Sequence, residues 1–225
     1  MFYYLGVDLG GGEKTFAVAI REKTNVGLHI EKSLSLKNNS PKPSSMVEII
    51  EFVRKNPVLG TAIDAPLSFS INLEKGFRAS DLALRSLLPR EYRKWVLSYH
   101  ALMGIPLRGL LLAQKLSPYC GAILETHPRA SFFFLLPKEK RYLAYKYKKE
   151  LLEEEEIDYL KNYFKKLFSL KLTHLIFYDD LLDALICALT SYLFFKKPEK
   201  LLFLPQEEKD LFGFGPFVII GESFL

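Results

Sequence analysis

The residues best suited to chemistry in this sequence are two aspartates, Asp180 and Asp183, set three positions apart in a long apolar segment. At this spacing both carboxylates lie on one face of a helix. Because the surrounding positions are apolar, we expect Asp183 to be buried, where an uncompensated carboxylate costs several kcal/mol. A divalent metal ion is the best candidate for that compensation, and a buried polar anchor is the alternative. Asp179 is predicted to cap the start of the same helix.

Three further acids, Asp8, Asp64 and Glu125, come at the ends of predicted apolar strands. In an open α/β sheet, groups at the carboxyl ends of neighbouring strands face one crevice, so we expect these acids to meet Asp180 and Asp183 there. Two carboxylates about 4 Å apart repel by on the order of 4 kcal/mol at an effective dielectric of about 20. Divalent cations would offset that repulsion, and ligation by oxygen alone favours Mg²⁺ or Mn²⁺ over zinc.

The elements that must position these acids follow from the hydrophobic pattern. Short apolar or alternating segments predict strands, and longer periodic segments predict helices. The strands are expected over 2–9, 16–21, 27–33, 58–63 and 122–124, and the first helices over 46–55, 78–88 and 106–116. Ser44 or Ser45 is expected to cap the helix at 46–55. Two short apolar segments, 201–205 and 217–220, follow near the end, and the second is a candidate edge strand.

The composition indicates a single domain, 1–225, with enough chain to bury roughly 70% of its unfolded surface. Residues 137–172 are rich in charge and are predicted to form a helical insertion within that domain. We interpret the insertion as a solvated helical pair with paired charges, or else as a surface that stacks on bases and neutralises phosphates. The second interpretation rests on interleaved aromatic and basic side chains: Tyr142, Tyr145, Tyr147, Arg141, Lys146, Lys148 and Lys149.

Charge and cysteine content limit the class of protein. The net charge of +5 and the pI of about 9.0 permit binding to a polyanion without requiring it. Cys120 and Cys187 are few and unpatterned, which favours reduced thiols and a cytoplasmic location. The sequence does not begin with a basic leader, and the longest apolar run, 181–195, is shorter than the roughly 20 residues of a membrane span. We therefore expect a protein without membrane segments.

Five short motifs follow one another along the chain: GVDLGG at 6–11, AIDAPLS at 62–68, RASD at 78–81, ETHPR at 125–129 and DLLDAL at 180–185. In this order they resemble the family of predicted ribonuclease-H-like nucleases known as domain of unknown function 429, over nearly the whole chain. The last motif is also similar to the terminal helix motif of RuvC-type Holliday-junction resolvases. The resemblance implies a ribonuclease-H-like α/β fold, with a mixed five-stranded sheet flanked by helices, and a metal-dependent phosphodiesterase site.

The resemblance also implies roles for the acids, in a hydrolysis that uses two metal ions, one to activate a water and one to neutralise the leaving oxygen. Asp8 would bridge the ions, Asp64 would hold one, and Asp180 with Asp183 would hold the other. Glu125 is expected to be an additional catalytic acid, as a ligand or as a partner of the ligands. The resolvases carry Glu at the position of Asp64, and the shorter side chain would shift the metal.

Basic residues supply candidates for binding the substrate, which we expect to be DNA or RNA. Arg78 and Arg129 could hold a phosphate with two hydrogen bonds, and Lys14 is a weaker candidate. His127 is interpreted as a hydrogen-bonded structural histidine, with proton transfer as the alternative. A resolvase-like activity would further imply a two-fold homodimer.

Two other functional classes stay open. The segment 8–15, DLGGGEKT, is similar to the phosphate loop of the sugar kinase and actin-like ATPase superfamily, although its glycines would equally turn a hairpin. That superfamily has two such domains and a second glycine-rich loop. Here Asp64 is followed by Ala-Pro and no later Asp-x-Gly occurs, which disfavours a kinase. The other class is a nucleic-acid-binding module that keeps the fold without the chemistry.

Overall fold

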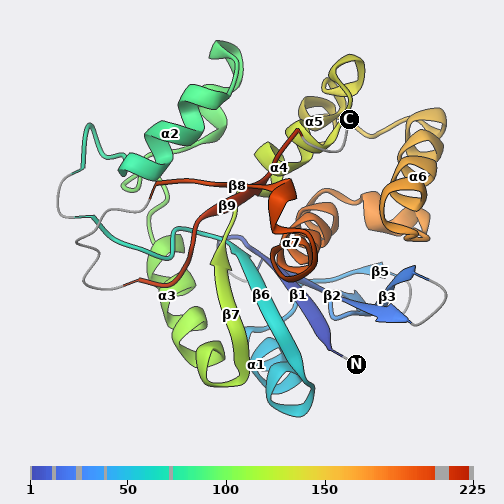
Figure 1. The fold of residues 1–225 in the computed structure, drawn as a ribbon, viewed down its shortest axis with the longest axis horizontal. Coiled ribbons are helices and arrows are strands. Elements are labelled where there is room, and N and C mark those ends of the chain that lie inside the picture. Colours follow the sequence, from blue (N-terminus) through green and yellow to red (C-terminus); the bar gives the residue numbers. More distant parts are fainter. Residues whose placement is uncertain are drawn as a thin grey trace.

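The computed structural model describes residues 2–11, 14–23, 27–37, 40–70, 73–205 and 213–222. Its main sheet has the strand order β3-β2-β1-β6-β7. The strands are β1 (Tyr3–Leu9), β2 (Thr15–Lys23), β3 (Gly27–Ser33), β6 (Val58–Asp64) and β7 (Cys120–Glu125). Strands β1, β6 and β7 are parallel, while β2 is antiparallel to both β1 and β3 (Figure 1). This mixed sheet confirms the predicted α/β fold of ribonuclease-H-like type.

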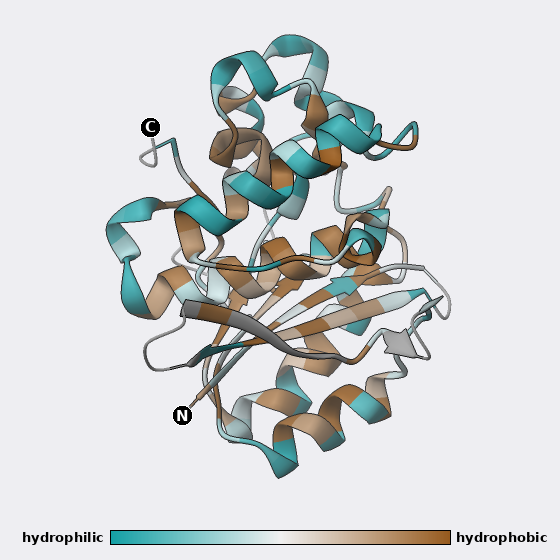
Figure 2. Cartoon of the chain, turned by 90° about the vertical axis from the view of Figure 1, so that its right-hand side faces the viewer, coloured by the Kyte–Doolittle hydropathy of each residue, from teal (hydrophilic) through white to brown (hydrophobic). Residues whose placement is uncertain are grey.

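Helices cover both faces of the sheet (Figure 2). On one face α7 (Asp179–Lys196) contacts β1, β2 and β6, and α4 (Pro128–Leu135) and α6 (Glu154–Phe168) add side chains to the same core. The core on the other face contains side chains of α1 (Met46–Lys55) and α3 (Ile105–Leu116). Successive side chains of a strand point to opposite faces, so Val18 and Ile20 join the first core and Ala17 and Ala19 the second. The remaining elements are α2 (Ala79–Leu87), α5 (Leu143–Lys146), β4 (Leu36–Lys37), β5 (Ser40–Pro41), β8 (Leu201–Phe203), β9 (Val218–Ile220) and the 3₁₀ helices η1 (Arg90–Trp95), η2 (Ser117–Tyr119), η3 (Lys138–Lys140), η4 (His174–Phe177) and η5 (Pro198–Lys200).

Side-chain caps were predicted for two helices, and the structure has one of them. Helix α1 starts after Ser45, whose hydroxyl accepts the Glu48 N–H at 3.2 Å while the Glu48 carboxylate accepts the Ser45 N–H at 2.8 Å. The cap is therefore Ser45 rather than Ser44. The prediction that Asp179 caps α7 is wrong, because Tyr178 is the N-cap residue and Asp179 is already helical. The Asp179 carboxylate is instead paired with Lys148.

The segment 137–172 is helical, as predicted, and contains η3, α5 and α6. Its apolar side chains Leu143, Leu160 and Phe164 are fully buried in the core that α7 shares. Its polar side is held partly by charge, since Lys146 pairs with Glu153 and Glu156 at 3.0 Å each. The segment thus belongs to the core beside the sheet, and its description as an insertion within one domain stays a prediction.

The two short apolar segments near the end pair with each other, β8 antiparallel to β9. Phe217, just before β9, forms a single bridge with Glu125 at the end of β7, and the Glu125 N–H bonds the Pro216 carbonyl at 3.0 Å. Among the described residues, no helix is both long enough and apolar enough to cross a membrane.

Helix α7 lies unusually close to β1 and β6 (Figure 1). A Cβ atom at Gly6 in β1 would lie 2.0 Å from the Ala184 carbonyl oxygen and 2.1 Å from the Ala188 nitrogen. At Gly60 in β6 it would lie 2.5 Å from the Phe195 ring. The approach at Gly6 sets Asp183, the residue before Ala184, beside the end of β1.

We expect Gly6→Ala to destabilise the fold, because its methyl group would overlap the α7 backbone, which cannot rotate away. Overpacking of this kind typically costs about 1–3 kcal/mol, and backbone contact places this site at the upper end. Urea unfolding followed by circular dichroism measures the change. Gly11→Ala is the matched control, because a Cβ at Gly11 would meet nothing within 4 Å. Equal stability of the two variants would contradict the close contact.

Candidate metal centre

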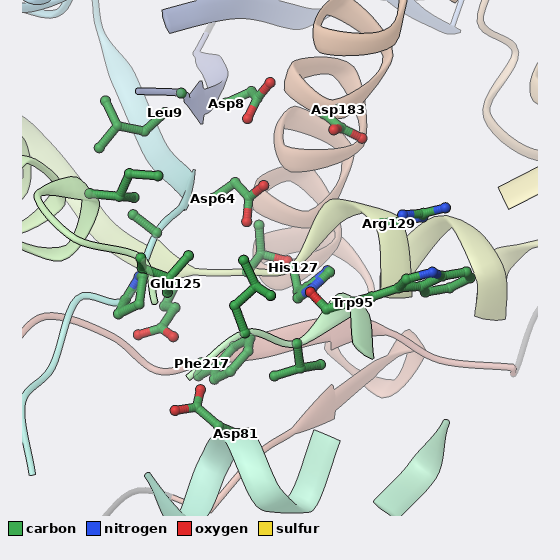
Figure 3. Close-up of a pocket in the computed structure, with 18 of the residues that line it drawn as sticks. Asp8, Leu9, Asp64, Asp81, Trp95, Glu125, His127, Arg129, Asp183 and Phe217 are labelled. Carbon is green, nitrogen blue, oxygen red and sulfur yellow. The ribbon is translucent and has the colours of Figure 1, made fainter. Parts of the chain in front are cut away.

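Three carboxylates from separate parts of the chain meet at the carboxyl ends of the parallel strands. Asp8 and Asp64 are direct partners in the register of β1 and β6. Asp183 reaches them from the second turn of α7. One carboxylate oxygen from each of the three lies within 4.8 Å of the others, and Figure 3 shows the side chains around a common space. The structure therefore brings these three predicted residues together.

Burial makes the negative charges of this group costly. Asp8 and Asp183 are only 9% and 2% exposed. Burial, followed by the carboxylates of Asp183 and Asp64, raises the pKa of Asp8 well above its usual range. Burial, followed by the Asp183 carboxylate, raises the pKa of Asp64 to about 8. Asp64 thus holds a proton at neutral pH unless a cation stabilises its ionised form.

Two residues that follow α5 contact Asp183. The Tyr147 hydroxyl donates a hydrogen bond of 2.6 Å to Asp183 Oδ1, and Lys148 Nζ pairs with Asp183 Oδ2 and with Asp179 Oδ1. Burial alone would lower the pKa of Lys148, but the carboxylates of Asp183, Asp8 and Asp179 raise it above its usual value. Lys148 is therefore a protonated cation at the edge of the group.

These contacts with Asp183 were not predicted from the sequence, which grouped Tyr147 and Lys148 with a nucleic-acid-binding surface. The sequence did contain one relevant signal, since a buried Asp183 requires a counter-charge. No spacing rule identifies which of the 31 lysines and arginines supplies it. Tyr147 is instead a buried residue, 5% exposed, that faces the acids.

Asp180 and Lys14 line the same cavity as the three aspartates without joining their group. Asp180 is partly buried, and burial together with the neighbouring Asp179 raises its pKa. Lys14 is exposed at the rim. The role of Asp180 as a metal ligand stays a prediction. Gly12 and Glu13 lie outside the described residues, so the predicted phosphate loop over 8–15 is not tested.

Arg78 and Glu125 form a second, closed cluster of charges with Asp81. Arg78 donates to Glu125 Oε2 at 2.9 Å and to Asp81 Oδ1 at 2.8 Å, and its remaining donors reach Asp81 and Ser68. It is 2% exposed, so the phosphate-binding role expected for Arg78 does not fit the structure. Burial raises the pKa of Glu125, and Arg78 opposes that change.

Glu125 pairs in the sheet with Ile63, the residue before Asp64, but its carboxylate is already engaged. Besides Arg78, the Leu67 N–H donates to Glu125 Oε2 at 2.8 Å. In Figure 3, Glu125 and Asp81 lie on the side of Asp64 away from Asp183. Glu125 is therefore placed to hold the loop after β6 in position rather than to join the three aspartates, and its catalytic role stays a prediction.

Arg129 and His127 lie on the opposite side of the cavity. The Arg129 guanidinium lies 4.1 Å from the Trp95 ring centroid and donates to the Ala144 and Tyr145 carbonyls. His127 Nδ1 accepts the Ala130 N–H, so Nε2 carries the proton and donates it to the Trp95 carbonyl at 3.2 Å. Burial lowers the pKa of His127. These bonds fit the structural interpretation of His127, because both ring nitrogens are engaged.

The cavity measures about 360 Å³ and is lined by both charged and apolar side chains. The charged lining consists of the acids and the cations Lys14, Arg78, Lys148 and Arg129. The apolar lining includes Val96, Leu97, Leu102, Ile105 and Phe217. A ligand here would place a charged group against the charged side chains and an apolar or aromatic part against the apolar ones.

In metal-free buffer, we expect Asp64→Asn to raise the melting temperature by an amount that grows from about pH 5 to about pH 8. The folded pKa of Asp64, about 8, lies above its ordinary value of 3.8, so the folded chain holds an extra proton in this interval and loses stability as pH rises. The amide removes that cost. Thermal unfolding in buffer with EDTA measures the difference in melting temperature between the variant and the wild type. Each kcal/mol of stability changes the melting temperature by roughly 2–4 °C. A difference independent of pH would contradict the shifted pKa.

Comparison with known proteins identifies a family for part of the chain. The model described as "Protein of unknown function (DUF429)" matches residues 105–210. The matched region contains Glu125, Arg129, Lys148, Asp180 and Asp183, whereas the motifs around the first two strand-end aspartates precede it. No curated protein and no solved structure matches the chain. The chain is therefore similar to the DUF429 family over residues 105–210, a little less than half of its length.

Proposed function

We propose that this protein is a metal-dependent nuclease that hydrolyses phosphodiester bonds in DNA or RNA. The observation that carries the proposal is the meeting of Asp8, Asp64 and Asp183, with an oxygen from each within 4.8 Å of the others. Buried carboxylates at this spacing are costly without a cation. A bound cation would offset that cost and would account for the meeting of three carboxylates from distant parts of the chain.

The donor set suits Mg²⁺ or Mn²⁺, because it offers carboxylate oxygens and neither thiolate nor imidazole. Asp8, Asp64 and Asp183 would hold the ion, with Asp180 nearby on the same helix. When bound, such an ion lowers the pKa of a coordinated water and neutralises charge on phosphate oxygens. The number of ions is not part of this proposal, and the sequence-based expectation of two ions stays a prediction.

The residues around the acids supply what a phosphodiester needs besides metal. Lys14 at the rim and Arg129 against Trp95 place positive charge on the cavity wall, where a phosphate would be attracted. Arg129 is held by two backbone carbonyls and an aromatic ring, so it is oriented before the substrate binds. The apolar side chains of the cavity lining would take a base or sugar. A cytoplasmic location and a homodimer stay predictions from the sequence.

We expect Asp8→Asn to reduce cleavage of single-stranded, branched and RNA–DNA hybrid substrates by at least about 100-fold. Replacing a residue that only supports a metal ligand already costs roughly 10–100-fold. The measurement is a gel assay with Mg²⁺ or Mn²⁺. Asp158→Asn is the control, because that carboxylate on α6 is 59% exposed and pairs only locally with Lys161. A fully active Asp8→Asn protein would refute the assigned role, and hydrolysis of ATP instead would favour a kinase-like protein.

Millimolar Mn²⁺ is expected to raise the melting temperature of the wild-type protein, because an ion bound only by the folded state stabilises it. At 100 times its Kd an ion contributes about 2.7 kcal/mol. Asp183→Asn should reduce this gain, whatever its effect on the melting temperature without metal. Differential scanning fluorimetry with and without Mn²⁺ measures both gains. Unchanged melting of the wild type on adding Mn²⁺ would argue against the metal site.

A further inference from the structure

Lys148 holds a position that a mobile surface lysine would not have. Its side chain is 21% exposed, and its Nζ pairs with two carboxylates, one of which belongs to the group of three aspartates. It also lines the cavity. A positive charge is therefore already present where Asp183 faces the proposed metal site.

The segment that carries Lys148 is anchored firmly. Leu143 and Ala144 of α5 are fully buried, and the Tyr147 ring packs edge-on against Phe132 at 5.5 Å between centroids. Tyr147 binds one oxygen of Asp183, and Lys148 binds the other. Adjacent residues thus engage both oxygens of one carboxylate, and the ammonium group is fixed by the fold.

This arrangement bears on how many metal ions the site can hold. Two divalent ions among three aspartates would require Asp183 to give its free electron pairs to the second ion. The Lys148 ammonium already neutralises that carboxylate, and it would repel a doubly charged ion placed beside it. The aspartates on the strand ends, Asp8 and Asp64, have no such lysine in contact among the ion pairs of the described residues.

We propose that Lys148 is a built-in cation that takes the place of one of the two expected metal ions. The site then binds a single divalent ion between Asp8, Asp64 and Asp183, with the Lys148 ammonium as a fixed positive charge beside it. This inference rests on the proposed function and deepens it. In a phosphodiester complex, the ammonium would face the phosphate and neutralise part of its charge, as the second ion would otherwise do.

The test is the number of Mn²⁺ ions bound per chain, measured by isothermal titration calorimetry and by the electron paramagnetic resonance signal of free Mn²⁺. We expect one ion for the wild type and two for Lys148→Met, which keeps an unbranched side chain one atom shorter and removes its charge. Lys148→Arg keeps the charge and should bind one. The matched control is Lys149→Met, which removes the charge of an exposed neighbouring lysine and should also bind one.

The outcomes separate this inference from the proposed function. Two ions in the wild type would overturn the inference and leave the nuclease proposal intact. No bound ion in the wild type would overturn both. One ion in both the wild type and a folded Lys148→Met protein would show that Lys148 does not fill an ion position, and would overturn the inference alone. If Lys148→Met does not fold, Lys148→Gln provides the same comparison.

Discussion

The arrangement of the site depends on the contact between helix α7 and the centre of the sheet. Gly6 carries no side chain, which lets the α7 backbone approach β1, and at Gly60 in β6 the missing side chain leaves room for the Ser191 and Phe195 side chains of the helix. A helix held farther away would keep its apolar packing against other residues but would withdraw Asp183 from Asp8. A glycine in a strand costs stability through backbone entropy, and here that cost allows the approach of another backbone.

The second constraint is electrostatic, and the fold meets it differently in two neighbouring places. Around Glu125, the Arg78 guanidinium pairs with two buried carboxylates, those of Glu125 and Asp81. Around Asp8, Asp64 and Asp183, Lys148 pairs with Asp183, while burial and then the Asp183 carboxylate raise the pKa of Asp64. The first cluster supports the strand ends and loops. The second retains an affinity for cations, which is the physical basis of the proposed chemistry.

Much of the fold could be predicted from the sequence, because its signals are local. Alternation and apolar runs located all the strands of the main sheet, and the serines at 44 and 45 marked the start of α1. The order of elements also placed Asp8 and Asp64 at neighbouring strand ends. Roles that depend on distant partners were harder to predict. Arg78 looked like a phosphate ligand, but buried carboxylates occupy it, and Asp179 looked like a cap, but Lys148 pairs with it.

The sequence by itself determined the strand and helix pattern, the burial of Asp183 and the acidic, oxygen-only chemistry of the candidate ligands, since each follows from residue type and short-range spacing. Only the tertiary structure decided which acids meet and which cations accompany them. Asp180 and Asp183 share one helix, yet only Asp183 joins the aspartates of the strand ends. Lys148 comes from a segment that the sequence assigned to the surface. Contacts between residues distant in sequence depend on how helices pack on the sheet, and local patterns do not encode that packing.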